Sequence, residues 1–227
     1  MVDWYIYYGF CEESKKILYK LVAADDIVID VGTNVGEITM NIASIIGKNG
    51  IVHSFEPFPI NYNRFLTNLS LNSFQNIVPN KFGLSNEKGK FIPLINDQKN
   101  LGMTSLATIE DANTENNTII DVITLDEYIT IQNIKKVSVI KIDVEGFELK
   151  VLQGARNTIQ KDKPKLFVEL DNNNLIKFNN SSKDLVKYLE SLNYCISLAE
   201  NGKIINSGDD FENCHFDIIG VPNKTIL

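Results

Sequence analysis

Four charged side chains lie close together between residues 141 and 148, and their types suit acid–base chemistry. They are Lys141, Asp143, Glu145 and Glu148. Carboxylates that gather in a cleft raise one another's pKa, so the three acids are candidates for a base that removes a hydroxyl proton. The alternative is a network, neutralised by Lys141, that shapes the loop and caps the following helix. We assign no metal site, because no histidine lies near these acids in the sequence.

A second group of residues, at 30–36, has the composition of a ligand-binding turn. It contains Asp30, Gly32, Asn34 and Gly36. Glycines allow a tight turn and close approach of the backbone to a ligand, and a helix N-terminus offers free N–H groups to a carboxylate or phosphate. Asp30 can contact the ammonium group of an amino-acid-like ligand. Alone, the segment also fits an ordinary strand-to-helix turn.

A carboxylate twenty residues after Gly36 narrows the choice of ligand. Glu56 ends a predicted strand, where its two oxygens can accept hydrogen bonds from both ribose hydroxyls of an adenosine ligand. Together with the glycine turn it favours S-adenosylmethionine. A nicotinamide dinucleotide fits less well, because Asn34 and Thr39 occupy the second and last glycine positions of the G-x-G-x-x-G pattern. Read alone, Glu56 also fits a solvated strand end.

The hydrophobic pattern predicts the elements that position these residues. Short apolar and β-branched runs predict strands at 27–31, 51–55, 77–84, 91–95, 137–142, 165–170, 194–198 and 216–221. Apolar residues at helical spacing predict helices at 12–22, 38–46, after the 57–59 turn, at 147–159 and at about 183–192. This alternation predicts an α/β fold with a mostly parallel central sheet, at whose carboxyl edge ligands bind.

Shorter signals complete the pattern. Thr124 and Glu127 have the spacing of a capping box that begins a short helix, and Asn201 with Gly202 predicts a hairpin turn that adds antiparallel C-terminal strands. The segment 96–117 is the longest polar stretch without periodicity, and the asparagines at 172–174 suggest a loop. We expect one domain over 1–227, with a helical lead-in, a cofactor-binding core and a C-terminal helix with edge strands. These parts are expected at 1–24, 25–170 and 171–227.

Composition excludes several classes of protein. The chain has 227 residues, 44% of them hydrophobic, and a formal net charge of -7, which opposes binding to nucleic acid. Its three cysteines are odd in number and share no metal-like spacing, so neither a disulfide framework nor a zinc site is expected. Neither a signal peptide nor an apolar run long enough to span a membrane is present, so we expect no membrane partner and a cytoplasmic location. The oligomeric state is not predicted.

The remaining polar candidates have weaker signals. His53 lies inside a predicted strand and His215 begins the last one, so both are expected to be core or supporting histidines rather than bases. Thr104 and Ser105 lie in the long polar segment, where their hydroxyls could line an acceptor pocket or simply face solvent.

Three ordered segments resemble the FkbM family of methyltransferases. They are VIDVGTNVG at 28–36, VHSFEP at 52–57 and KIDVEGFELKVLQGA at 141–155. The threonine-leucine-aspartate at 124–126, the strand 164–169 that ends in glutamate, and the segment GMTSL at 102–106 are similar to further stretches of that family. The resemblance spans most of the chain. Thr33 and Phe58 depart from the commoner alanine and asparagine, which leaves the substrate undetermined.

The resemblance implies a class I methyltransferase (Rossmann-like) fold and S-adenosylmethionine as the methyl donor. Carried over by position, it implies that the turn and the ends of neighbouring strands bind the cofactor, with Asp143 beside the sulfonium. The implied cofactor-binding residues are Asp30, Gly32, Thr33, Asn34, Gly36, Glu56, Pro57, Gly83, Leu84 and Asp143.

The expected reaction is methyl transfer to a hydroxyl oxygen of a small-molecule or carbohydrate acceptor. Most of its acceleration can come from aligning donor and acceptor in a dry pocket, with Asp143, Glu145 or Glu148 removing the hydroxyl proton. Two alternatives stay open at this stage. One is an NAD(P)-dependent oxidoreductase of Rossmann type, and the other is a non-catalytic module that binds S-adenosylmethionine.

Overall fold

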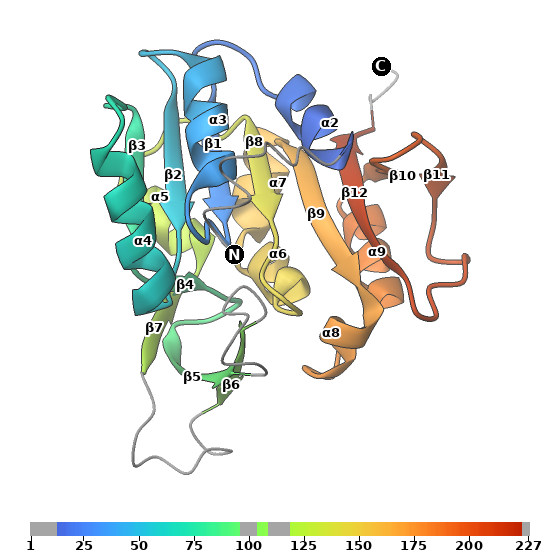
Figure 1. Cartoon of the computed structure of the whole chain (residues 1–227). Coiled ribbons are helices and arrows are strands. Elements are labelled where there is room, and N and C mark those ends of the chain that lie inside the picture. The colour runs from blue at the N-terminus through green and yellow to red at the C-terminus, as the bar shows by residue number, and fades with distance from the viewer. Residues whose placement is uncertain (1–12, 96–103, 109–118, 224–227) are drawn as a thin grey trace.

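The larger of two β-sheets forms the centre of the protein. The computed structural model describes residues 13–95, 104–108 and 119–223 (Figure 1). Within them the central sheet has the strand order β11-β10-β12-β9-β8-β1-β2-β3. Its parallel part consists of β1 (Ile27–Val31), β2 (Ile51–Phe55), β3 (Ile77–Asn80), β8 (Val139–Ile142) and β9 (Lys165–Asp171). The predicted α/β fold with a mostly parallel sheet is therefore confirmed.

The C-terminal strands extend this sheet in antiparallel fashion. β12 (His215–Pro222) pairs with β9, β10 (Tyr194–Leu198) pairs with β12, and the short β11 (Ile204–Ile205) forms the edge. The predicted antiparallel hairpin is confirmed between β10 and β11. The last strand, however, lies inside the sheet between β9 and β10, where its Ile218 is fully buried.

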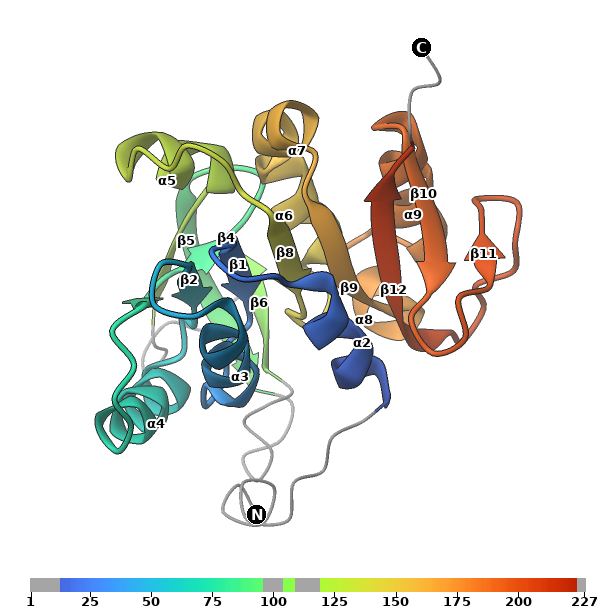
Figure 2. The same cartoon turned by 90° about the horizontal axis from the view of Figure 1, so that it is seen from above.

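Helices cover both faces of the central sheet. Figure 2 shows α2 (Glu13–Leu21), α3 (Glu37–Ile46) and α4 (Pro59–Ser70) on one face. On the opposite face lie α5 (Leu125–Ile131), α6 (Glu148–Gly154), α7 (Arg156–Asp162) and α9 (Ser182–Ser191). The predicted cap of α5 is confirmed, because the hydroxyl of Thr124 accepts the backbone N–H of Glu127 at 3.0 Å. Among the described residues, no helix is both long and apolar enough to cross a membrane.

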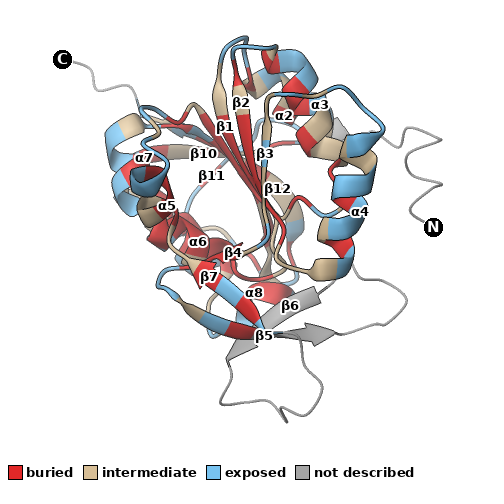
Figure 3. Ribbon diagram, turned by 90° about the vertical axis from the view of Figure 1, so that its left-hand side faces the viewer, coloured by how far each residue is buried: buried red, intermediate tan, exposed pale blue. Residues whose placement is uncertain are grey.

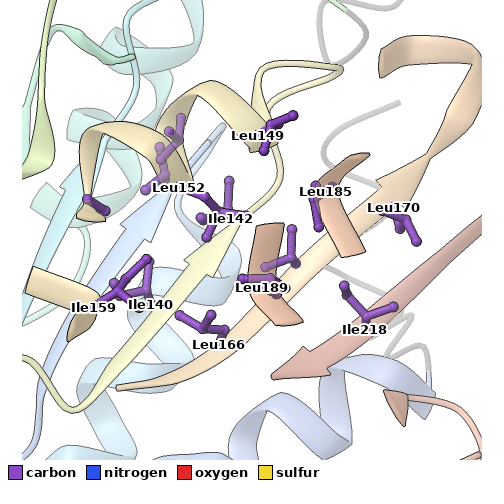
Figure 4. Packing of buried hydrophobic residues seen from close by; sticks show 14 of the residues in the cluster. Ile140, Ile142, Leu149, Leu152, Ile159, Leu166, Leu170, Leu185, Leu189 and Ile218 are labelled. Atoms are coloured by element: carbon purple, nitrogen blue, oxygen red, sulfur yellow. The ribbon is translucent and has the colours of Figure 1, made fainter. Parts of the chain in front are cut away.

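The core under α6 and α9 holds the strands that carry the site. Ile140 and Ile142 of β8 and Leu166 of β9 are fully buried against leucines of these helices (Figure 4). Each such side chain contributes about 1.5–3 kcal/mol through burial alone. Figure 3 shows how completely the central strands are buried compared with the outer faces of the helices. The carboxyl ends of β8 and β9 are therefore rigidly placed.

A second, four-stranded sheet lies beyond the carboxyl ends of the parallel strands (Figure 1). Its order is β4-β7-β5-β6, formed by β4 (Gly83–Leu84), β7 (Ile120–Ile123), β5 (Gly89–Ile95) and β6 (Thr104–Thr108). The predicted strand at 77–84 is therefore wrong as a single strand. It divides because Phe82 turns inward to pack on Phe55 and Tyr128, which separates β3 from β4.

Three further predictions need correction. The helix predicted at 147–159 is two helices, since Ala155 leaves helical geometry with φ −104° and ψ 8°. The polar segment 96–117 contains β6, which gains its structure by pairing with β5. The asparagines at 172–174 begin a short helix, α8 (Asn172–Ile176), because Asp171 caps it. Residues 1–12 of the predicted lead-in lie outside the described residues, and the single-domain division stays a prediction.

Candidate functional site

A cavity of about 380 Å³ opens at the carboxyl edge of the parallel strands. This volume is within the range of small-molecule sites. The cavity brings together most of the predicted residues, although they come from four separate segments. Those that line it are Gly32, Thr33, Asn34, Glu56, Pro57, Gly83, Leu84, Asp143 and Glu145. Asp30, Gly36 and Glu148 are not among the lining residues.

The glycine turn is packed so closely that its glycines cannot be replaced without displacement. Gly32 has φ +83°, and a Cβ there would overlap the carbonyl oxygen of Asp143. Gly36 has φ +90°, and a Cβ there would overlap the ring of Phe65. Both backbone conformations disfavour other residues as well. The turn after β1 is thus fixed against the end of β8, and Gly36 acts by positioning the turn.

Asp30 lies beneath the cavity, paired with a buried lysine. Its side chain is 0% exposed, and one oxygen lies 3.3 Å from Nζ of Lys141, which is 2% exposed. The other oxygen accepts the hydroxyl of Thr39. Burial lowers the pKa of Lys141, but the carboxylates of Asp30 and Asp143 outweigh that effect and raise it. The expected contact between Asp30 and a ligand's ammonium group therefore needs correction, since Lys141 already occupies that position.

Lys141 also ties the glycine turn to the acids of the loop after β8. Its ammonium group donates to the carbonyl oxygen of Gly32 at 2.9 Å and lies 3.5 Å from a carboxylate oxygen of Asp143. One buried cation thus holds the ends of β1 and β8 together. This agrees with the neutralising role that the sequence suggested for it.

Glu56 connects two loops at the cavity wall. Its Oε2 accepts the N–H of Asn34 at 2.8 Å, and its Oε1 accepts the N–H of Phe58 at 2.9 Å. Burial raises the pKa of Glu56 to about 7, although these two hydrogen bonds lower it. Because each carboxylate oxygen can accept a second hydrogen bond, two positions are left for ligand hydroxyls.

The loop after β8 separates the roles of the predicted acids. Glu148 is 1% exposed, and its Oε1 accepts the N–H groups of Val144 and Gly146 at 3.1 and 3.0 Å. These contacts favour the alternative, loop-shaping role for Glu148. Glu145 lines the cavity and has a positive φ of 54°, while its Oε2 accepts Nδ2 of Asn174 at 2.6 Å. Of the two glutamates, the cavity therefore exposes Glu145 to a ligand.

Sequence reasoning did not assign Glu169 to the site. Its carboxylate lines the cavity, and oxygen atoms of Asp143, Glu145 and Glu169 lie within 4.8 Å of one another. We call these three residues the acidic cluster. Burial and the charges of Asp143 and Glu145 raise the pKa of Glu169 to about 10. The signals in the sequence were its place near the end of a predicted strand and the similarity of that strand to a stretch of the FkbM family. The prediction that no metal is bound stays a prediction.

The two histidines have different positions. His215 lines the cavity, with Nε2 3.3 Å from Glu169 and Nδ1 3.6 Å from Asp171. The antiparallel register, in which His215 faces Asp171, brings it there. His53 is buried with Nδ1 2.8 Å from the hydroxyl of Tyr128, and burial lowers its pKa to about 4. The side chains of Thr104 and Ser105 lie outside the described residues.

The sequence profile described as the methyltransferase FkbM domain matches residues 30–196, which include the glycine turn, Glu56 and the acidic cluster. The chain belongs to the FkbM methyltransferase family. Members of this family use S-adenosylmethionine, so the predicted cofactor is that of the family. The hexuronic acid methyltransferase AglP of Haloferax volcanii is 31% identical to this chain over 147 residues, which are 64% of this chain and 56% of AglP.

Solved structures place this FkbM domain in the class I methyltransferase fold. Methyltransferase FkbM from Methylobacillus flagellatus KT superposes with a TM-score of 0.57 at 20% identity, covering 88% of this chain and 44% of that chain. Fibrillarin from Aeropyrum pernix, solved with natively bound S-adenosyl-L-methionine, gives a TM-score of 0.50 at 16% identity, covering 88% and 67%. The chain spans about half the length of the curated relatives that it matches, 56% and 58%.

Proposed function

We propose that this domain binds S-adenosylmethionine in the cavity and transfers its methyl group to a hydroxyl oxygen of a small-molecule or carbohydrate acceptor. The observation that carries the proposal is the convergence of the glycine turn, Glu56 and the acidic cluster on one cavity. Family membership favours this reaction over the dinucleotide oxidoreductase. The charge of the cavity supports the same choice, because acidic walls suit a cationic sulfonium better than an anionic pyrophosphate.

The residues present fit the proposed cofactor. Glu56 retains two acceptor positions, which suit the paired hydroxyls of a ribose. The two glycines fix the turn against Asp143 and Phe65, and this places the segment 32–34 at the cavity wall, where a ligand can contact it. Asp143 offers a negative charge at the cavity wall. When bound, the cofactor supplies an electrophilic methyl group, and the S–C electron pair leaves with sulfur as the C–O bond forms.

The acceptor hydroxyl must lose its proton, and the cavity offers Glu145 to take it. Burial and the neighbouring charge of Asp143 raise the pKa of Glu145 to about 7, close to the value that suits a base at neutral pH. Glu169 is less suited, because a carboxyl with a pKa of about 10 keeps its own proton. The relative that acts on a hexuronic acid supports a carbohydrate as the acceptor class.

Binding and chemistry can be tested in turn. Calorimetry with S-adenosylhomocysteine should give a saturable isotherm, and Glu56→Gln should weaken it at least about tenfold, the equivalent of one lost charged hydrogen-bonding group. Asp25→Asn serves as the matched acid-to-amide control, since Asp25 is exposed and lies before the amino end of β1, at the opposite edge of the sheet from the cavity. Unchanged affinity in Glu56→Gln would exclude the assigned cofactor site.

Methyl transfer is then measured with S-adenosylmethionine carrying a labelled methyl group and a set of methyl glycosides and methyl uronides. Label in an ether product supports the proposed hydroxyl transfer. Label that appears only in methyl esters or on nitrogen would overturn it. Tight cofactor binding without label in any acceptor, including extracts of the source cell, would identify the non-catalytic alternative.

A further inference from the structure

Asn174 is a buried polar residue that the predicted site did not include. It lies in α8 and is 7% exposed. Its side-chain Nδ2 donates to Oε2 of Glu145 at 2.6 Å, and its Oδ1 accepts Nζ of Lys177 at 2.6 Å. Only this orientation of the amide satisfies both charged neighbours, because the reverse would direct the amide NH2 at the ammonium group and the oxygen at the carboxylate. Lys177, Asn174 and Glu145 therefore form a directed chain of hydrogen bonds.

The fold holds the two ends of this chain in fixed positions. Asp171 caps α8, because its Oδ1 accepts the N–H groups of Asn173 and Asn174 at 2.8 and 3.1 Å. On the other side, Gly146 packs so closely that a Cβ there would lie 2.5 Å from the carbonyl oxygen of Asn174. The turn after β8 and the start of α8 therefore touch backbone to backbone. Such contact restricts how far Glu145 and Asn174 can move apart.

The backbone of Glu145 indicates that this position is imposed by its surroundings. A φ of 54° is unfavourable for a residue with a side chain, by about 1–2 kcal/mol. Such conformations persist where neighbouring structure fixes them, and they concentrate at functional sites. Within the described part of the chain, hydrogen bonds reach Oε2 of Glu145 but not Oε1. The second oxygen is thus left to accept a proton.

We propose that Asn174 and Lys177 are positioning residues, which direct the carboxylate of Glu145 toward the acceptor hydroxyl and stabilise its ionised form. The role of Glu145 as a base rests on the proposed function, whereas the hydrogen bonds that position it do not depend on that function. Transfer of the hydroxyl proton to Oε1 neutralises Glu145 while the acceptor oxygen forms its bond to the methyl carbon. The amide keeps Oε2 in place throughout.

The charges around Glu145 explain why such support is needed. The carboxylates that raise its pKa come from two strands, Asp143 at the end of β8 and Asp171 at the end of β9, in addition to burial. The charge of Glu145 in turn raises the pKa of Glu169 in β9. Against these, the hydrogen bond from Asn174 and the charge of Lys177 lower the pKa. Removing either should therefore favour the protonated form and move the base out of its working range.

The test compares Asn174→Ala and Lys177→Met with Asn173→Ala, an exposed neighbour in the same helix whose side chain makes no described contact with Glu145. Protein labelled with carbon-13 in its glutamate carboxyls is titrated by NMR in buffer with EDTA, and Glu145→Gln identifies the signal. We expect the pKa of Glu145 to rise by about one unit in Asn174→Ala, a tenfold change in proton affinity, and by less in Lys177→Met. Lys177→Arg should retain the native value.

The pH profile of methyl transfer gives the second measurement. Its acidic limb should move to higher pH by the same amount, while the affinity for S-adenosylhomocysteine changes by less than about twofold, or roughly 0.4 kcal/mol. An unchanged pKa in both folded variants would overturn the inference while leaving the proposed function intact. A shifted pKa without transfer to any acceptor would support the positioning chain and refute the proposed function. Should Asn174→Ala fail to fold, Lys177→Met decides alone, because Lys177 contributes only its charge and one hydrogen bond.

Discussion

The buried ion pair of Lys141 and Asp30 should make the largest single polar contribution to stability at the carboxyl edge of the parallel strands. We therefore predict the effect of Lys141→Met, a change that keeps the length of the side chain but removes its charge. The lysine is 2% exposed, and the aspartate that remains behind is 0% exposed. Breaking such a pair costs about 3–5 kcal/mol, because it leaves one buried charge without a partner.

The contacts of the lysine indicate where in this range the value should lie. Asp143 is 42% exposed on its side chain and adds little, since solvent screens its attraction to the lysine. The carbonyl oxygen of Gly32 loses a charged donor at 2.9 Å, and this loss of about 1.5–3 kcal/mol is part of the 3–5 kcal/mol and places the cost above the lower limit of that range. We therefore expect about 4 kcal/mol. In urea, with a slope of about 3 kcal/mol per molar, the midpoint should fall by about 1.3 M.

A double-mutant cycle separates this pair from other consequences of the substitution. Asp30→Asn alone leaves the lysine buried without its main partner, whereas the double variant leaves neither charge. The double variant should therefore be more stable than the sum of the single effects predicts, by about 1–3 kcal/mol. Urea unfolding followed by circular dichroism measures all four proteins. A cost below about 1 kcal/mol for Lys141→Met, or strictly additive effects, would refute the assignment of the pair.

Three further predictions concern the turn, the pH dependence and the acceptor. Gly32→Ala should abolish binding of S-adenosylhomocysteine in calorimetry. Gly47→Ala should lower the free energy of unfolding by only about 1 kcal/mol, because Gly47 also has a positive φ but a Cβ there would meet nothing within 4 Å. Burial raises the pKa of Glu56 and Glu148 to about 7, so the folded chain holds more protons than the unfolded chain between about pH 4.5 and 7. The stability that these two groups contribute is thus fully present below this window and is lost as pH rises through it. A melting temperature that is no higher near pH 5 than near pH 8 would contradict the effect. A neutral methyl glycoside should accept the labelled methyl group faster than the matching uronide, because the acidic cluster repels a carboxylate. Equal initial rates would argue against such repulsion of the acceptor by the acidic cluster.

Local sequence carried most of the information about the elements near the cofactor. The strands β1, β2, β8 and β9 are rich in apolar and β-branched residues because most of their side chains are buried, so their positions were predictable from the local sequence. The capping residue Thr124 was also predictable from the local sequence, because its partner Glu127 lies three residues away. Elements with weak local signals were predicted wrongly. The break at Ala155 and the pairing of β6 with β5 depend on contacts with distant segments.

The acidic end of the site shows where local reasoning stops. Asp30 and Asp143 were both recognised as functional acids, but the sequence did not reveal that Lys141 lies between them and keeps Asp30 out of the cavity. That arrangement follows from the register of β1 and β8, in which Asp30 pairs with Lys141. β1 and β8 are far apart in the sequence, so which residues of the two strands face each other depends on their pairing in the folded chain and has no local signal within either strand.

The sequence by itself indicated the fold class, the family and the candidate cofactor-binding residues, because the glycine turn, Glu56 and the acids after β8 each lie in a short contiguous pattern. Only the tertiary structure decided which acids face the cavity and what supports them. Glu169, His215 and Asn174 reach the site through the pairing of β12 with β9 and the capping of α8. Contacts between residues about 30 to 70 positions apart depend on three-dimensional packing, since folding must offset the entropy of closing those loops before any such contact forms.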